Sequence, residues 1–198
     1  MQLTEKGIYH IYNRGINKQT IFSSPGNYIY FLGKVRKYLS PATDILGYCL
    51  MPNHFHFLIH ASEKSIIPAK AGAVEMQLVS AAIKHILSSY TKAYNKMYGR
   101  TGSLFVQNTH CKQIFSDVGN SQGAFICFNY IHQNPLRAKM VAKIEDWQYS
   151  SFNDYIGLRN GTLCNQKKTY ELLALDKEFI YQETYQTLEK ETTNKLLF

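Results

Sequence analysis

The sequence predicts an α+β fold, a ferredoxin-like βαββαβ sandwich with one added helix. Two observations lead to this prediction. Four short runs rich in β-branched and aromatic residues alternate with two segments of helical periodicity, in the order strand, helix, strand, strand, helix, strand. A further helical segment follows the fourth strand. This element order is typical of the ferredoxin-like topology, and we expect the added helix to lie against the sheet.

The first strand and the first helix have clear boundaries in the sequence. The strand is predicted over Gly7 to Asn13, where β-branched and aromatic residues dominate. A polar turn at 23–26 then introduces a helix from Asn27 to Leu39. Ser40-Pro41 ends this helix, because proline disfavours helical geometry in the residue before it.

The second half of the sandwich begins with two adjacent strands. They are predicted at Asp44 to Met51 and at His54 to His60, joined by the turn residues Pro52-Asn53. A long helix follows over Met76 to Tyr98, and Asn108 to Phe115 is the fourth strand. The stripe of this helix expected to face the core consists of Val79, Ile83, Ile86, Leu87, Tyr90, Tyr94 and Met97.

The added helix is predicted to end at Asn134, because Pro135 cannot donate the next backbone hydrogen bond. The residues at helical spacing that should face the core are Phe125, Phe128 and Ile131. Tyr130 and Asn134 are four residues apart and therefore share one side of the last turns. Such a helix can present a phenol and a carboxamide oxygen to the same point.

After the added helix, Asp146 to Tyr155 is expected to wrap back onto the body, and Tyr170 to Phe198 is expected to be helical and moderately charged. These expectations divide the chain into a domain at 1–156 and a C-terminal, helical extension at 157–198. There is no internal repeat beyond the approximate duplication that the βαββαβ topology itself carries.

The most informative motif is His54-Phe55-His56 in the third strand. Side chains alternate between the two faces of a strand, so the two histidines point the same way while Phe55 points into apolar surroundings. Two neutral imidazoles on one rigid face can hold a divalent ion. His60 shares this face, but it lies roughly 7 Å further along the strand, so we expect a capping or surface role for it.

Composition narrows the class of protein. The formal charge of +8 and the pI near 9.2 favour an anionic partner, of which nucleic acid is the simplest. The four cysteines lie far apart without a Cys-x-x-Cys pair, which argues against a zinc knuckle or a disulfide framework. The sequence has neither a signal-peptide pattern nor a run long enough to span a membrane, and we expect a cytoplasmic protein.

Several segments together resemble a known family. The stretches at 51–59 (MPNHFHFLI), 130–138 (YIHQNPLRA) and 147–152 (WQYSSF) are similar to the ordered signatures of single-tyrosine HUH transposases, most closely the REP-associated tyrosine transposases. The stretches at 9–15 (YHIYNRG) and 98–105 (YGRTGSLF) fit the same branch. The resemblance runs from about Ile8 to about Tyr155 and leaves the last forty or so residues uncovered.

The resemblance implies a chemistry. His54, His56 and the side-chain oxygen of Asn134 would hold Mg²⁺ or Mn²⁺, and Tyr130 on the catalytic-tyrosine helix would be the nucleophile. Its attack on single-stranded DNA would give a 5′-phosphotyrosine and a free 3′-hydroxyl. Because one phosphodiester replaces another of similar energy, the strand can later be transferred to a new hydroxyl without ATP. A free phenol has a pKa of about 10, so this nucleophile needs activation.

The expected partner is single-stranded or hairpin DNA. Asn13 and Arg14 match a loop that lies near bound DNA in similar proteins, and they are assigned to DNA binding on that ground. The basic residues on or just beyond the non-core side of the long helix could track a phosphate backbone. These residues are Lys84, Lys92, Lys96 and Arg100. The sequence leaves open whether the chain acts as a monomer or a homodimer.

Three other readings stay open at the level of sequence. A host-adopted nuclease or replication initiator could use the same HUH chemistry on repeat hairpins. A non-catalytic ferredoxin-like module could bind nucleic acid through its sheet, although the sequence lacks the aromatic signature of RNA-binding domains. A metal-dependent hydrolase unrelated to DNA would need carboxylates near the histidines, and Asp44 and Glu63 are poorly placed for that.

Overall fold

The computed structural model describes residues 1–115 and 122–186. A four-stranded antiparallel sheet forms its centre, with the strand order β2-β3-β1-β6. Its strands are β1 (Ile8–Arg14), β2 (Asp44–Met51), β3 (His54–His60) and β6 (His110–Phe115). This is the strand order of a ferredoxin-like βαββαβ sandwich, so the predicted α+β fold is confirmed.

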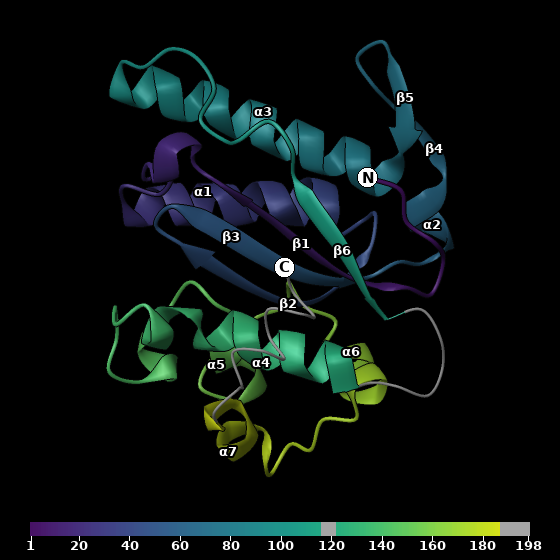
Figure 1. Ribbon diagram of the computed structural model, residues 1–198, viewed down its shortest axis with the longest axis vertical. Helices are drawn as coiled ribbons and strands as arrows, with labels where there is room; N and C mark the ends of the chain where they lie inside the picture. Colours follow the sequence, from purple (N-terminus) through teal and green to yellow (C-terminus); the bar gives the residue numbers. More distant parts are fainter. Residues whose placement is uncertain (116–121, 187–198) are drawn as a thin grey trace.

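The two connecting helices cover one face of the sheet (Figure 1). They are α1 (Pro25–Lys34), which continues as a π-helical turn over Val35–Leu39, and α3 (Leu78–Tyr98). The core between these helices and the sheet is aromatic: the Phe31 ring packs against Phe55 at 5.3 Å and edge-on against Tyr90 at 5.1 Å. The odd-numbered residues of β3 therefore face α1 and α3, and the even-numbered ones face the other side.

The other face of the sheet is covered by α4 (Gln122–Arg137) and by elements that follow it (Figure 1). Gly47 on β2 permits the close approach of α4, because a Cβ at this position would lie 3.3 Å from the Phe128 ring. The shorter elements on this side are η3 (Ile144–Asp146), α5 (Phe152–Tyr155), α6 (Gln166–Leu173) and α7 (Ile180–Tyr185).

The prediction that the added helix ends at Asn134 is wrong, because α4 continues through Pro135 to Arg137. Proline removes the N–H that would bond to the carbonyl of Ile131. The side chain of Asn134 compensates, since its Nδ2 donates to the carbonyl oxygens of Tyr130 at 2.9 Å and of Ile131 at 3.4 Å. The helix therefore passes the proline with this carbonyl still hydrogen-bonded.

Two further features differ from expectation. Met97, placed in the core stripe of α3, is 67% exposed, whereas Val79, Ile83, Ile86, Tyr90 and Tyr94 are buried. A short helix α2 (Glu63–Ile66) and a hairpin of β4 (Pro68–Ala71) and β5 (Val74–Gln77) lie between β3 and α3 and were not predicted.

The segment after η3 wraps back onto the sheet as predicted. This segment is hydrogen-bonded to the edge of β2. The backbone N–H of Leu50 donates to the carbonyl of Tyr149 at 2.9 Å, and the backbone N–H of Ser151 donates to the carbonyl of Tyr48 at 3.0 Å. The segment predicted to be helical from Tyr170 to Phe198 is helical in the end of α6 and in α7, whereas residues 174–179 between them are not, beginning with the left-handed Ala174 (φ 50°). The part of the prediction after residue 186 lies outside the described residues. None of the helices in the described ranges could span a membrane.

Candidate active site

The strand register places His54 and His56 side by side on the sheet face that α4 covers. Their rings lie 5.0 Å apart between centroids and are nearly perpendicular, at 87°. In the antiparallel pairing with β1, Arg14 lies opposite His54 and Tyr12 lies opposite His56. The shared face expected from the alternation of strand residues is thus present, under the tyrosine-bearing helix.

His54 is oriented by the residue before it. Its Nδ1 lies 2.6 Å from Oδ1 of Asn53, an acceptor at the turn between β2 and β3. A neutral imidazole that donates from Nδ1 carries a lone pair on Nε2. Burial, with a smaller contribution from Arg14, lowers the pKa of His54 to about 4, so the ring is neutral at physiological pH. His54 therefore fits the requirement for a metal ligand.

His56 is almost completely buried, at 3% exposure. Its Nδ1 is hydrogen-bonded to Nε2 of His10 on β1 at 2.9 Å, whereas its Nε2 is buried and has no hydrogen-bond partner among residues 1–115 and 122–186. Burial, His10 and His54 all lower its pKa well below the usual value. A neutral ring with one satisfied nitrogen and one orphaned, buried nitrogen is the arrangement expected of a ligand position.

The helix α4 sets Tyr130 against this pair. The Tyr130 ring stands edge-on to the His56 ring, with 6.0 Å between centroids and an angle of 85°. Burial raises the pKa of the phenol, and Arg137, whose guanidinium lies 5.6 Å from the ring centroid, acts in the opposite direction. The structure thus brings a tyrosine from α4 to the paired histidines of β3, which are more than 70 residues earlier in the chain.

Asn134 lies one helical turn after Tyr130. Because its Nδ2 is engaged with backbone carbonyls of the helix, the amide orientation is fixed and Oδ1 is the end directed away from those carbonyls. Within residues 1–115 and 122–186, no group of three or more His, Cys, Asp and Glu side chains could hold a metal ion. A third protein ligand beside the two histidines would therefore have to be of another type, such as a carboxamide oxygen.

The neighbouring His132 belongs to the packing of α4 and not to this face. It is fully buried, and its Nε2 lies 2.8 Å from the hydroxyl of Ser151 in the segment that wraps along β2. Burial lowers its pKa to about 3.

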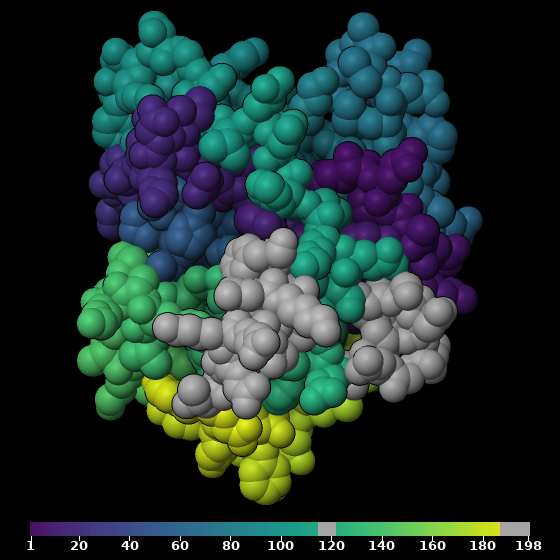
Figure 2. All heavy atoms as spheres, viewed as in Figure 1, coloured from purple at the N-terminus to yellow at the C-terminus, as the bar shows by residue number. Residues whose placement is uncertain are grey.

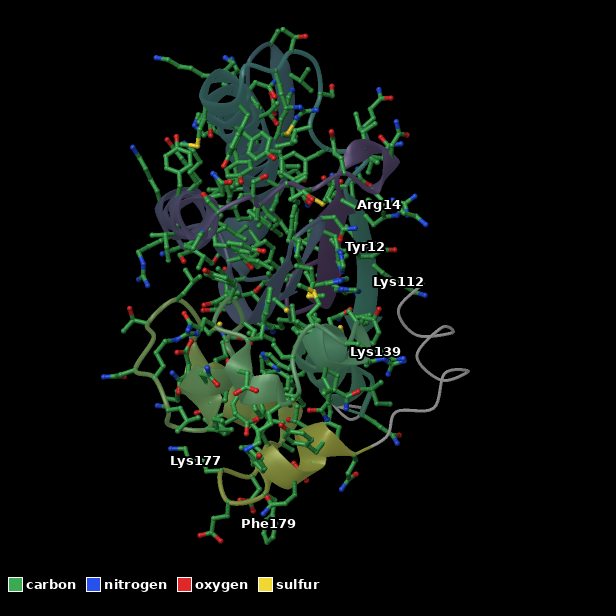
Figure 3. All side chains as sticks on the ribbon, turned by 90° about the vertical axis from the view of Figure 1, so that its left-hand side faces the viewer. Tyr12, Arg14, Lys112, Lys139, Lys177 and Phe179 are labelled. Carbon is green, nitrogen blue, oxygen red and sulfur yellow. The ribbon has the colours of Figure 1, made fainter. Side chains whose placement is uncertain are left out.

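The residues assigned to DNA binding lie in three different environments. Arg14 is exposed at the end of β1, on the same side of the molecule as Tyr12, Lys112 and Lys139 (Figure 3). Asn13 points to the opposite face and is only 1% exposed, because its Nδ2 donates to the carbonyl of Val106 and to Thr109 Oγ1. Its amide holds the segment before β6 in place and is not presented to solvent.

The basic residues of α3 lie on the helical layer that faces away from α4 (Figure 1). Lys84 and Lys92 are exposed and line a groove of about 830 Å³ between α3 and the 102–109 segment, and Lys96 is exposed further along the helix. The space-filling view shows the molecule hollowed beside the β4–β5 hairpin (Figure 2). Arg100 is engaged within the fold, since it donates to Gln19 Oε1 at 2.7 Å.

Sequence reasoning missed the aromatic row that flanks the histidine pair. The face of His56 also carries His10 and Tyr12 of β1 and His110 of β6. The Tyr12 ring stacks on the rings of His10 and His110, with 4.7 Å between centroids in each case. The signal was present in the alternation of Tyr9-His-Ile-Tyr12, which puts His10 and Tyr12 on one face. The sequence did not show which strands would lie beside β1 on that face, because strand order and register are not local properties.

The fold and the site define a ferredoxin-like protein whose sheet carries paired histidines under a tyrosine-bearing helix. The same fold occurs in a solved structure described as the REP-associated tyrosine transposase bound to a REP hairpin. The similarity has a TM-score of 0.55 at 12% sequence identity and covers 82% of this chain and 87% of that one. No protein-family model matches the sequence, and no curated protein matches it. The likeness is therefore one of fold.

Proposed function

We propose that this chain is a single-tyrosine HUH transposase or nuclease that cleaves and rejoins single-stranded DNA through a 5′-phosphotyrosine on Tyr130. The observation that carries the proposal is the edge-on contact of the Tyr130 ring with His56, whose buried Nε2 has no hydrogen-bond partner in the described part of the chain. A neutral, buried imidazole in contact with a tyrosine ring supports a metal ligand and a nucleophile brought together within one chain. The shared fold with the REP-associated tyrosine transposase supports the same class.

In the proposed reaction the Tyr130 oxygen forms a bond to phosphorus and the bond from phosphorus to the 3′-oxygen breaks. The phenol loses its proton, and the departing 3′-oxygen takes one up to become a hydroxyl. Because burial raises the pKa of Tyr130, the phenol is protonated at neutral pH and must lose its proton during attack. A Mg²⁺ or Mn²⁺ ion held by His54, His56 and the Asn134 oxygen would supply Lewis-acid polarisation of the scissile phosphate.

DNA is the proposed substrate because the surface beside the site is basic. The chain carries a formal charge of +8, and Arg14, Lys112 and Lys139 lie along one side of the molecule (Figure 3). The protein with the shared fold is described as bound to a REP hairpin. We therefore propose single-stranded or hairpin DNA as the partner, with its backbone near these cations.

The test is formation of a covalent adduct. Full-length protein incubated with Mn²⁺ and single-stranded DNA containing the hairpins that flank its gene should give a protein–DNA species that survives denaturation. Tyr130→Phe removes only the nucleophilic oxygen, so we expect at least a thousandfold loss of adduct with unchanged folding. Tyr30→Phe is the matched control, because this tyrosine is 46% exposed on α1, on the other side of the sheet.

Two outcomes would contradict the proposal. An adduct that persists in Tyr130→Phe would mean that another tyrosine is the nucleophile. Hairpin DNA that binds tightly but is never cleaved, with Mg²⁺ or with Mn²⁺, would favour a non-catalytic module. In the first case, mass spectrometry of the protease-digested adduct identifies the peptide that carries the nucleotide and therefore the tyrosine that reacted.

A further inference from the structure

His10 is a buried histidine that the proposed chemistry does not use. It is 0% exposed, and its Nε2 lies 2.9 Å from Nδ1 of His56. Its ring also stacks on Tyr12, with 4.7 Å between centroids, and on His56, with 5.1 Å. Two ring contacts and one hydrogen bond fix the position of His10 within the sheet face.

The hydrogen bond between the two imidazoles can be made in two ways, because a neutral imidazole has one N–H and one lone pair. In the first arrangement His56 donates from Nδ1, and its Nε2 carries a lone pair. In the second His10 donates from Nε2, and His56 carries its proton on Nε2. Each arrangement leaves one nitrogen on each ring outside this bond, and neither His10 Nδ1 nor His56 Nε2 has a partner among the residues that the structure describes. Only the first arrangement allows His56 to bind a cation through Nε2.

We propose that His10 is a positioning residue that holds His56 in its Nδ1–H tautomer and so keeps Nε2 available as a metal ligand. The proposal rests on the proposed function, in which His56 binds a divalent cation. His54 has an equivalent outer partner in Asn53, whose Oδ1 lies 2.6 Å from His54 Nδ1. The two ligand rings would thus be oriented by two different neutral groups, a carboxamide at the turn and an imidazole on β1.

Among the described residues, the hydrogen-bond partner of His56 Nδ1 is His10 and not a carboxylate. Outer partners of metal-bound histidines are commonly carboxylates, carbonyls or water, and their loss lowers metal affinity by about 10- to 100-fold. In the described part of the chain, the carboxylate that pairs with a histidine is Asp44, 3.6 Å from His60 Nδ1. Neither His10 nor His56 has such an ion pair there, and the hydrogen bond between the two rings is the contact through which His10 would select the Nδ1–H tautomer of His56.

Mn²⁺ binding to the full-length chain, followed by the electron paramagnetic resonance signal of the free ion, tests this role. His10→Phe keeps a planar ring for stacking but has no acceptor, so the dissociation constant should rise about 10- to 100-fold. His10→Gln returns a carboxamide oxygen that can accept from His56 Nδ1, and it should recover most of the affinity. His60→Phe is the matched control, a second buried histidine on this face, and it should bind Mn²⁺ like the unmodified chain.

The tautomer itself gives a second readout that a merely structural role would not move. In the metal-free chain, long-range ¹H–¹⁵N correlation spectra should show the His56 proton on Nδ1 in the unmodified protein and a mixture of tautomers in His10→Phe. Unchanged Mn²⁺ affinity in His10→Phe, or a metal-free, unmodified chain in which His56 is protonated on Nε2, overturns the proposal. A chain that binds no Mn²⁺ refutes the metal site and this role together, whereas one that binds Mn²⁺ without cleaving DNA refutes only the proposed transposase activity.

Discussion

At the scale of single residues, burial decides the protonation of the groups around the sheet face. His10 and His56 are 0% and 3% exposed, and burial is the largest cause of the lowered pKa in each case. Burial acts on Tyr130 in the other direction and raises its pKa. The same low-dielectric environment therefore disfavours the charged form of each group and keeps both the imidazoles and the phenol neutral.

The buried His132 leads to a prediction about stability and pH. Its pKa is about 3 in the folded chain, against an ordinary value of 6.5. The unfolded chain therefore binds a proton between these values when the folded chain does not, so stability is fully present above about pH 6.5 and is lost as the pH falls. Urea denaturation should show that the free energy of unfolding decreases as the pH is lowered. His132 should contribute about 1.4 kcal/mol of this decrease per pH unit near pH 5.

His132→Leu isolates this contribution. The variant loses the hydrogen bond to Ser151 but has no titrating group at this position. Between pH 6 and 4 its free energy of unfolding should fall less steeply than that of the unmodified chain, by about 1.4 kcal/mol per pH unit. Parallel slopes for the two proteins would show that His132 is protonated in the folded chain at a higher pH than its burial indicates.

At the scale of elements, α4 is held from both sides. Phe128 packs against Gly47 on the sheet side, and Gln133 donates from Nε2 to the carbonyls of Thr184 at 2.7 Å and Gln186 at 2.8 Å on the other. Asn129 adds a bond, because its Oδ1 accepts from Thr184 Oγ1 at 3.0 Å. The C-terminal helix α7 therefore fixes the helix that carries Tyr130 on the sheet of the same chain (Figure 1).

Gln133→Ala should weaken this attachment. The change removes both donors and leaves the carbonyl of the fully buried Thr184 without its partner, which costs about 1–3 kcal/mol. We expect a lower urea midpoint and faster proteolysis between α6 and α7, measured by limited digestion and mass spectrometry. Gln182→Ala, an exposed glutamine on α7, is the matched control. Equal digestion of both variants would show that Gln133 does not hold α7.

At the scale of the whole molecule, charge is divided between two surfaces. Arg14, Lys112 and Lys139 lie along the side of the molecule that includes β1, β6 and the end of α4 (Figure 3). Lys84, Lys92 and Lys96 lie on α3, in the layer across the sheet from α4 (Figure 1). The lysines assigned to DNA from the sequence are therefore not on the layer that holds Tyr130.

Salt dependence of DNA binding distinguishes these two surfaces. The affinity for hairpin or single-stranded DNA should fall steeply with salt, and Arg14→Gln should reduce the logarithmic slope by about 0.7, the value for one phosphate contact on a single strand. Lys92→Gln should leave the slope nearly unchanged, because this residue is exposed on the distant layer. A reduced slope for Lys92→Gln alone, measured by fluorescence anisotropy, would instead place the DNA along α3.

The sequence by itself determined the elements whose signals are local. The bounds of β2 and β3 follow from alternation and from the Pro52-Asn53 turn, and the shared face of His54 and His56 follows from the two-residue period of a strand. The order of these elements was sufficient to predict the ferredoxin-like sandwich, because few topologies accommodate it.

Tertiary structure alone decided what depends on contacts between distant segments. His10 and His56 are 46 residues apart and meet through the register of β1 and β3, which a single strand does not specify. Asn13 became a buried anchor for the segment before β6, although its sequence neighbour Arg14 is exposed. In each case the hydrogen-bond partner comes from a distant segment of the folded chain, and local propensity carries no information about it.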